Sequence, residues 1–404
     1  MFINHNIVPV IMFHSVGLHE SKWIFSHISE PVECFEAKIS ILKSKGYNFI
    51  FWNELYEYMA GNRKLPQKSI MLTFDDGYLD NWVYAYPILK KYGAKATIFV
   101  NPEFVDRGDR KRFNLENVWQ GNCRIDEIDA RGFLNWTEMR EMENSGLIDI
   151  QSHSLTHTWY FKSPNIIDYH RPQKIHPYPW LFWNKRPDRK PFYLKECQEN
   201  YIEYGHPIFE YEKALVVRRF FPNSNIISKA INFVKENGGK NFFQQKNWRE
   251  KINKYMDDVL KKTNNKGKIE TKEQYIQRVT YELQQSKKMI EEHLNKKVEF
   301  ICWPGGGYNK IVLDIAKKVG YKAWTLSSKD KTNFRNLPHS NPQNIKRIGS
   351  YIKYNIRGIK EFGYANANYF IAMIEAHKGS LLHKYYAKLI KVFGIFNYLI
   401  CGRN

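Results

Sequence analysis

The chain has 404 residues, of which 43% are hydrophobic and 16% aromatic, so most of it is expected to fold around a substantial core rather than stay disordered. Its 62 Lys+Arg against 41 Asp+Glu give a formal net charge of +21, which predicts an anionic partner: phosphate groups, nucleic acid or an anionic membrane surface. Five scattered cysteines without a CxxC pair predict a reduced compartment without structural disulfides. The first residues lack the pattern of a signal peptide, and no apolar run approaches the ~20 residues that span a bilayer, so a cytoplasmic location is expected.

Short apolar runs alternate with amphipathic segments over residues 8–157, and the pattern returns from residue 272. The predicted strands are Val8 to Phe13, Tyr47 to Phe51, Ser69 to Phe74, Ala96 to Val100, Leu147 to Ile150, Val298 to Cys302 and Lys322 to Leu326. The predicted helices are Glu33 to Lys45, Asp80 to Tyr92, Trp136 to Ser145, Lys272 to Leu294 and Lys310 to Val319. This alternation, with glycines at the turns, predicts an α/β fold with a parallel sheet or a β/α barrel.

A stretch of different composition, residues 158–270, interrupts this pattern. It is rich in aromatic residues and proline, and its 22 Lys+Arg against 12 Asp+Glu carry nearly half of the net charge. We interpret it as a large insertion on one end of the scaffold, with a linker at residues 261–268. The predicted organisation is one domain over residues 1–350, with core segments 8–157 and 272–350, followed by a basic amphipathic tail over 351–404.

Two adjacent carboxylates, Asp75 and Asp76, end the apolar strand in the sequence Leu-Thr-Phe-Asp-Asp-Gly. An isolated Asp-Asp-Gly is usually a turn. At the C-terminal end of a strand in a β/α scaffold, however, one carboxylate can bind a metal while the other stays free as a base.

A pair of histidines, His153 and His157, follows the strand that ends near Ile150. Two imidazoles four residues apart on a helical turn converge on one point, which is common geometry for a divalent metal. Because the carboxylate pair also lies at a strand end, the two motifs together favour a metal site over incidental spacing.

These motifs resemble those of the polysaccharide deacetylase family, carbohydrate esterase family 4, whose domain is known as the NodB-homology domain. The matching motifs are TFDDG at 73–77 and HSxxH at 153–157, with a weaker Pro-Gly motif, CWPGGGY, at 302–308. The resemblance covers residues 8–157 and about 272–350. It implies a distorted (β/α) barrel of the polysaccharide deacetylase type with a large insertion.

The resemblance also implies roles for individual residues. Asp76, His153 and His157 would ligate one divalent metal ion, and Asp75 would be the base that deprotonates the attacking water. The backbone N–H of Tyr78 would help to stabilise the oxyanion. From the third motif, the residues expected to line the substrate site are Trp303, Pro304 and Gly305.

Two departures from the family pattern affect the candidate catalytic groups. Trp303 stands where the family commonly has the arginine that holds the base, so Asp75 must be oriented by another group. The usual late Leu-x-His is not evident, which leaves the general acid unassigned by the common pattern. In members similar to poly-N-acetylglucosamine deacetylases, a histidine after the first strand takes this role, and His14 matches that position. A lone histidine there can equally be a structural one.

Two basic segments have alternative interpretations. Arg218 and Arg219 in the insertion suit phosphate recognition, although an arginine pair is more often a solvated surface. Near the C-terminus, residues 381–400 place Lys384, Lys388 and Lys391 along one helical stripe among apolar side chains. This pattern is typical both of a helix that lies on an anionic membrane and of a helix that packs on a barrel.

The function that fits these features is metal-dependent removal of an N-acetyl or related acyl group from an amino sugar, in the synthesis of a surface polysaccharide. The high positive charge and the expected location favour a lipid- or nucleotide-linked sugar at the inner membrane face. Zinc is the expected metal, and cobalt, nickel or iron would accept the same ligand types. The alternatives are hydrolysis of a non-sugar amide at the same metal site and a catalytically silent glycan-binding module. Nucleic-acid binding is disfavoured because no matching signature accompanies the charge.

Overall fold

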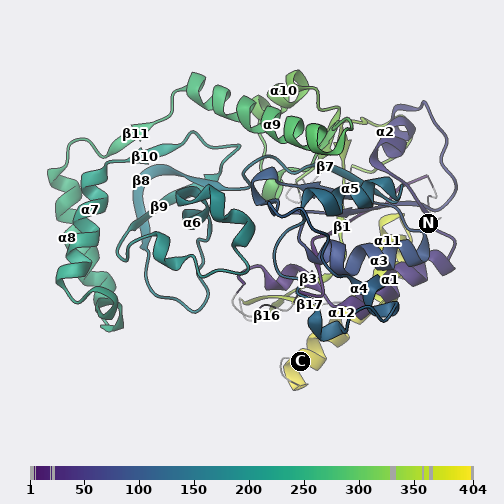
Figure 1. Ribbon diagram of the computed structural model, residues 1–404, viewed down its shortest axis with the longest axis horizontal. Helices are drawn as coiled ribbons and strands as arrows, with labels where there is room; N and C mark the ends of the chain where they lie inside the picture. The colour runs from purple at the N-terminus through teal and green to yellow at the C-terminus, as the bar shows by residue number, and fades with distance from the viewer. Residues whose placement is uncertain are drawn as a thin grey trace. The chain divides into compact units, whose positions relative to one another are not determined.

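The computed structural model describes residues 4, 6–18, 20, 23–327, 334–356, 359–363 and 367–401. The chain forms two compact units. The first comprises residues 1–154, 286–306 and 321–404, and the second comprises residues 155–285 and 307–320 (Figure 1). Among the described helices, none combines the length and the apolar character needed to cross a membrane.

The first unit is built on a parallel sheet. The strands of the first unit are β1 (Val10–Phe13), β2 (Ser15–Val16), β3 (Ser29–Glu30), β4 (Asn48–Phe49), β5 (Ser69–Phe74), β6 (Ala96–Val100), β7 (Ile148–Ser152), β12 (Phe300–Ile301), β13 (Ala323–Thr325), β14 (Asn344–Ile345), β15 (Ile348–Gly349), β16 (Ile352–Ile356) and β17 (Ile359–Gly363). Of these, β2 and β3 form a separate parallel pair, and β16 and β17 form a separate antiparallel pair. Its helices are α1 (Val32–Ser44), α2 (Trp52–Ala60), α3 (Tyr86–Tyr92), α4 (Leu115–Trp119), α5 (Trp136–Asn144), α11 (Ala367–His377) and α12 (Leu381–Cys401). Helix α9 (Lys272–Leu294) begins in the second unit and ends in the first.

The sheet curls back on itself. Its strand order is β14-β13-β12-β7-β6-β5-β1-β15, with β4 also paired to β5, and the described pairings are parallel. The strands at the two ends of this order, β14 and β15, are separated in the chain only by Lys346 and Arg347. One stretch, residues 344–349, therefore pairs with β13 at one end and with β1 at the other. This arrangement confirms the predicted distorted (β/α) barrel.

Apolar packing inside the first unit fixes the sheet. Trp52 of α2 is fully buried and lies between two strands, stacked on Phe300 of β12 and edge-on to Phe99 of β6, with ring centroids 5.3 Å apart in both cases. At the carboxyl ends of their strands, Phe13 of β1 stacks on Phe74 of β5, with ring centroids 5.2 Å apart. Such aromatic contacts between neighbouring strands add to the stability that comes from area burial.

Most predicted elements of the first unit agree with the structure. The bounds of β5 and β6 match the predictions, and α1 and α5 begin within one residue of them. The expected helix Asp80 to Tyr92 is instead a π-helical turn, Asn81–Ala85, followed by α3. The strand expected from Val298 to Cys302 is shorter, because only Phe300 and Ile301 are in the β-ladder.

The second unit has its own hydrophobic core. Its elements are β8 (Trp159–Tyr169), β9 (Pro207–Lys213), β10 (Phe220–Pro222), β11 (Gly267–Ile269), α6 (Trp180–Lys185), α7 (Ser224–Glu236), α8 (Trp248–Lys262) and α10 (Lys310–Val319). Strands β8 and β9 form an antiparallel pair, as do β10 and β11. Phe209, Val234, Phe242 and Met256 belong to one buried cluster. The predicted insertion, residues 158–270, lies wholly in this unit, while the predicted domain boundaries stay predictions.

A histidine pair, His170 buried and His176 partly buried, lies in the second unit. His170 Nδ1 and His176 Nε2 are 2.8 Å apart, and His170 Nε2 lies 3.1 Å from the carbonyl oxygen of Glu199. That carbonyl can only accept, so His170 donates to it through Nε2 and accepts through Nδ1 from His176. The backbone N–H of Tyr178 donates to His176 Nδ1 at 3.2 Å, so each ring carries one proton and both are neutral. Consistently, burial lowers the pKa of His170 to about 4 and that of His176 to about 3.

Candidate active site

Four polar side chains follow the carboxyl ends of neighbouring strands in the first unit. His14 follows β1, Asp75 follows β5, His153 follows β7 and Cys302 follows β12. These strands are parallel members of one sheet, in which β5 pairs with β1 and β7 with β12, while β6 lies between β5 and β7. Their carboxyl ends therefore lie along one edge of the sheet. This edge is where catalytic groups collect in β/α barrels.

The backbone is strained at both predicted motifs. Asp76 has φ 74° and Ser154 has φ 65°, in the left-handed region that side chains rarely adopt. Gly77 follows with φ 68°, and a Cβ added there would lie 2.9 Å from Val100 Cγ1 on β6. Strained residues persist only where the surrounding structure holds them, and they gather at functional sites. The turn after β5 therefore needs glycine at position 77 and fixes the direction of Asp76.

Asp75 forms a buried ion pair with Arg347, which lies between β14 and β15. The guanidinium donates from Nη1 to Oδ1 at 2.7 Å and from Nη2 to Oδ2 at 2.8 Å, and both side chains are at most 10% exposed. Burial raises the pKa of Asp75, but Arg347, together with His153 and His14, lowers it to about 2. Asp75 is thus held ionised in a fixed orientation, as a general base requires.

His153 faces the second carboxylate of the motif. Its Nε2 lies 3.3 Å from Asp76 Oδ1, and its Nδ1 lies 2.8 Å from the carbonyl oxygen of Cys302. That carbonyl is an acceptor, so Nδ1 carries a proton and Nε2 faces Asp76. Burial lowers the pKa of His153, but Cys302, Asp76 and Asp75 raise it well above its usual range.

These contacts favour positive charge between Nε2 of His153 and the Asp76 carboxylate, supplied by a proton or by a cation. A metal-ligating histidine typically donates its other ring N–H to a backbone carbonyl, as His153 does. One imidazole nitrogen and one carboxylate oxygen are also donors that suit zinc and similar divalent ions. The residues present therefore fit the implied metal.

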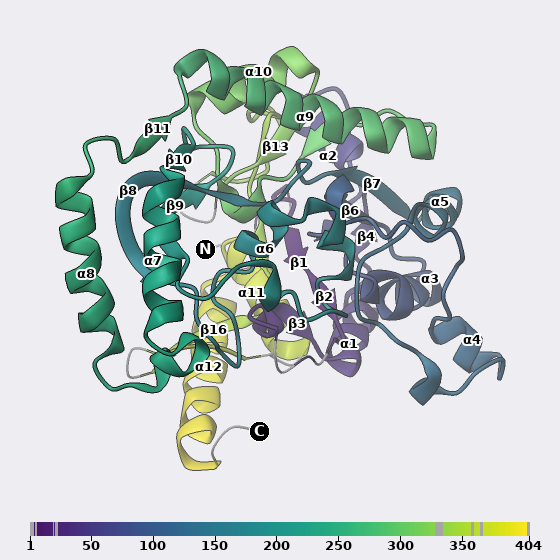
Figure 2. The same ribbon diagram turned by 60° about the vertical axis from the view of Figure 1, so that its left-hand side comes forward.

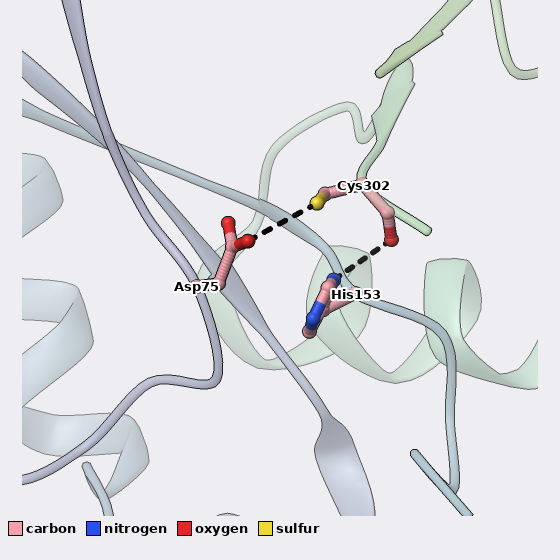
Figure 3. Close-up of side chains that lie close together, drawn as sticks. All are labelled: Asp75, His153 and Cys302. Carbon is pink, nitrogen blue, oxygen red and sulfur yellow. Dashed lines mark hydrogen bonds between the residues drawn. The ribbon is translucent and has the colours of Figure 1, made fainter. Parts of the chain in front are cut away.

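Asp75, His153 and Cys302 form a second group with metal-binding atoms, all within 4.8 Å of one another. Figure 3 shows the Cys302 thiol directed toward Asp75 and the Cys302 carbonyl directed toward His153. Both oxygens of Asp75, however, already accept from Arg347, and Arg347 Nη2 also lies 3.0 Å from Cys302 Sγ. This cationic neighbour disfavours a metal ion at the second group, so the Asp76 side of His153 is the better position.

His14 lies beside the ionised carboxylate, with Nε2 3.8 Å from Asp75 Oδ2. The amide of Asn81, in the π-helical turn, donates to the His14 carbonyl at 2.9 Å and fixes its backbone. Such turns are frequent at functional sites. Burial lowers the pKa of His14, and Asp75 and Asp76 oppose this effect without cancelling it.

Of the other predicted residues of the first unit, Tyr78, Trp303 and Pro304 are buried and Gly305 is exposed. The ring of Tyr78 packs against Trp23 and Phe133, with centroids 5.1 and 5.3 Å away. Trp303 is 1% exposed, and its backbone N–H donates to Thr325 Oγ1 at 3.3 Å. Pro304 is also buried, and Gly305 adopts φ 53°. Their roles toward the oxyanion and the substrate stay predictions.

Three predicted residues belong to the second unit. The ring of His157, whose φ is 41°, packs edge-on against Trp159 at 5.5 Å. Arg218 donates from Nε to the carbonyl of Glu270 at 2.6 Å, and Arg219 lies over the ring of Tyr160, 4.4 Å from its centroid. The metal role of His157 and the substrate roles of both arginines stay predictions.

Arg347 and Cys302 are contacts of the candidate base that the sequence did not identify. The absence of the usual third-motif arginine did predict that another group must orient Asp75, and Arg347 is that group. A single arginine between two strands of two residues each gives no periodic signal, so only the closed sheet order shows that it reaches Asp75.

Comparison with known proteins confirms the resemblance seen in the sequence motifs. The family model for polysaccharide deacetylase matches residues 62–175 and 240–324, which include the carboxylate and histidine motifs. The chain carries a polysaccharide deacetylase domain. A solved structure of a de-N-acetylase from Aggregatibacter actinomycetemcomitans resembles the chain with a TM-score of 0.51 at 20% identity, covering 84% of this chain and 94% of that one. At this identity the likeness supports the fold alone.

Curated relatives match the deacetylase domain over shorter stretches. YxkH of Bacillus subtilis, named as a polysaccharide deacetylase, is 31% identical over 156 residues, which are 37% of this chain and 54% of that protein. Poly-beta-1,6-N-acetyl-D-glucosamine N-deacetylases of Escherichia coli and Staphylococcus aureus are 25% and 32% identical over 150 and 133 residues. These matches cover 37% and 32% of this chain, and 21% and 38% of the relatives. The chain thus spans about half the length of YxkH and less of the others.

Proposed function

We propose that this protein is a metal-dependent N-deacetylase that removes an acetyl group from an amino sugar of a glycan. The observation that carries the proposal is the pair of adjacent carboxylates in different environments. Asp75 is held ionised by Arg347, while Asp76 faces the imidazole of His153. Two neighbouring carboxylates whose different surroundings give them different roles are typical of a hydrolytic site.

The proposed ligands of the metal are Asp76, His153 and His157. Asp76 and His153 face each other at 3.3 Å, and His157 follows His153 by four residues in the chain. A divalent ion held by these residues supplies Lewis acidity for the attacking water and the acyl carbonyl. Zinc fits the two-imidazole, one-carboxylate set best, and cobalt, nickel or iron fit the same ligand types.

The proposed reaction assigns one step to each of these side chains. The Asp75 carboxylate accepts a proton from water as the water oxygen forms a bond with the acyl carbon. The backbone N–H of Tyr78 is proposed to donate to the oxyanion that forms on the carbonyl oxygen. The C–N bond then breaks, and the nitrogen leaves as an amine after it takes a proton from His14, beside Asp75. The products are a free amine and acetate.

The substrate class rests on the names of the relatives. Those from Escherichia coli and Staphylococcus aureus act, by name, on poly-beta-1,6-N-acetyl-D-glucosamine, which supports a β-1,6-linked N-acetylglucosamine chain as the substrate. The net charge of +21 supports a form of the sugar that carries phosphate, linked to a lipid or a nucleotide. We place the reaction in the biosynthesis of a surface polysaccharide, at the cytoplasmic face of the membrane.

The test is acetate release by the purified protein from a panel of acetylated compounds. The panel contains a β-1,6-linked N-acetylglucosamine oligomer, nucleotide-linked and lipid-linked N-acetylglucosamine, and a non-sugar acetamide. Acetate from an amino sugar in the panel, abolished by a chelator and restored by zinc, is the expected result. Release from the non-sugar amide alone, or glycan binding without any release, would contradict the proposal.

A further inference from the structure

Helix α12 carries an unusual concentration of exposed apolar side chains. Of the 16 large apolar side chains exposed among the described residues, eight lie on this helix. They are Leu381, Leu382, Tyr385, Tyr386, Leu389, Val392, Phe393 and Phe396, with Leu382 77% and Phe393 66% exposed. Elsewhere such residues occur singly or in small groups, as is normal for a protein surface. A continuous exposed patch of this kind marks an interaction site.

The eight residues share one side of the helix. At about 100° per residue, they fall within an arc of about 140°. The least exposed residues of α12, which are His383, Ala387, Ile390 and Gly394, lie on a different side. Lys384, Lys388 and Lys391 form a third stripe, next to the apolar arc. The helix therefore has a half-buried side, an exposed apolar side and a basic border.

Helix α11, which precedes α12, is anchored to the first unit, while the apolar side of α12 is left open. Phe370 of the preceding helix α11 is fully buried and lies 6.3 Å from Phe13 of β1. At the N-terminus of α12, the backbone N–H of His383 donates to Ser380 Oγ, and that of Lys384 donates to the Ser380 carbonyl. Figure 2 shows α12, in yellow, continuing from α11 and running out beyond the other elements of the first unit. No described side chain of α12 is buried, so the helix is not part of the barrel core.

We propose that α12 docks the protein on an anionic lipid surface, with its apolar side in the headgroup region and its lysines on lipid phosphates. Charge selects this partner, since the sequence of α12 contains three lysines and no acidic residue. A membrane-surface helix has the same arrangement, an apolar side bordered by cations whose alkyl stems extend to the headgroups. Pairing with a second copy is disfavoured, because it would bring lysine stripes together without any acid on the helix to offset them.

The inference does not depend on the proposed deacetylase function, because no residue of α12 belongs to the candidate active site. Variants of the helix should therefore release acetate from a soluble substrate at the wild-type rate. Failure of the docking and failure of the catalysis are then separate results.

The experiment is co-sedimentation of the full chain with vesicles of phosphatidylcholine, with and without about one third phosphatidylglycerol. The wild type should bind the anionic vesicles, and binding should weaken as salt rises. Leu389→Glu combined with Phe393→Glu should abolish binding. Replacing Lys384, Lys388 and Lys391 by Gln should weaken it by roughly tenfold or more, since each lysine near an anionic surface adds several-fold in affinity.

A matched pair of tyrosines controls for the general effect of a new charge. Tyr385 on α12 and Tyr281 on α9 are 62% and 60% exposed. Tyr385→Glu should reduce vesicle binding, whereas Tyr281→Glu should leave it unchanged. Circular dichroism of every variant checks that the fold is retained.

Two outcomes would overturn the proposal. One is wild-type protein that fails to bind the anionic vesicles, and the other is equal loss of binding in both tyrosine variants. If sedimentation equilibrium instead shows a dimer that Leu389→Glu/Phe393→Glu dissociates, while vesicles are not bound, α12 is a subunit contact and the lipid assignment is wrong.

Discussion

Arg347→Met should be the most revealing substitution outside the metal ligands. It retains much of the side-chain volume but removes the partner of Asp75, whose carboxylate is 5% exposed and accepts two hydrogen bonds from the guanidinium. Removing one partner of a buried ion pair costs about 3–5 kcal/mol, because the remaining charge is left without compensation. The free energy of unfolding of the variant should fall by about this amount.

The same substitution should change the pH dependence of catalysis. Arg347 is the strongest of the groups that lower the pKa of Asp75 to about 2, against a burial effect that raises it. Without the guanidinium the pKa of Asp75 rises, and the base is ionised only at higher pH. The acidic limb of kcat/KM, which reports groups of the free enzyme, should therefore move to higher pH.

Three further variants isolate the cause. Asp75→Asn combined with Arg347→Met removes both charges, so most of the lost stability should return. Arg347→Lys keeps the charge without the two-fold contact and should fall between the wild type and Arg347→Met. Arg124→Met removes an exposed ion pair, in which Arg124 is 74% exposed, and should cost less than about 1 kcal/mol.

The assays are urea unfolding followed by tryptophan fluorescence, and acetate release measured across pH. Stability of Arg347→Met within about 0.5 kcal/mol of the wild type, with an unmoved acidic limb, would refute the ion-pair argument. Equal losses in Arg347→Met and Arg124→Met would show that the effect is not specific to Asp75.

Three other outcomes follow from the geometry. His153→Ala should lose bound metal and activity together, and full metal content by elemental analysis would show that the ligand is misassigned. His14→Ala should keep the metal and lose turnover on an amide, but lose much less on an activated acetyl ester, whose leaving group needs no proton; equal losses on both would indicate a positioning role. The neutral pair of His170 and His176 should stabilise the second unit above pH 6.5 and lose that contribution as the pH falls toward 4, because the unfolded chain then binds more protons. Over this range each histidine adds about 1.4 kcal/mol per pH unit to the slope of the free energy of unfolding against pH. The urea midpoint should therefore drop between pH 7 and 4.5, and it should drop less in His176→Gln. A pH dependence that this substitution leaves unchanged would contradict the assignment.

Local patterns in the sequence were sufficient to predict several elements closely. Strands β5 and β6 of the first unit, helix α10 of the second unit and helix α9, which belongs to both, have bounds that match the predictions. The placement of Asp75 and His153 at strand ends followed from the same patterns. Both motifs are short and directly follow strong strands, so the amino-acid pattern alone indicates that they share one edge of the sheet.

Long-range contacts could not be predicted in this way. The pairing of Arg347 with Asp75 joins residues 272 positions apart, through strands β14 and β15 that are too short to show a period. The second unit is similar, because its core depends on β8 pairing with β9 across 37 residues of irregular chain and short helices.

The C-terminal helix shows a third limit of prediction from sequence. Its pattern suited both a membrane surface and a barrel, and the exposure of its apolar side disfavours packing on the barrel.

The most direct test of the account is the comparison of Asp75→Asn with the wild type on an N-acetylated, β-1,6-linked glucosamine oligomer. Metal content and acetate release are measured on the same samples, with Asp188→Asn, an exposed acid paired with Arg186, as the control. The account predicts unchanged metal content and a rate that falls by roughly 10²–10⁴-fold, because an amide cannot accept the proton from water. A metal-loaded Asp75→Asn that releases acetate within about tenfold of the wild-type rate would contradict the assignment of Asp75 as the base.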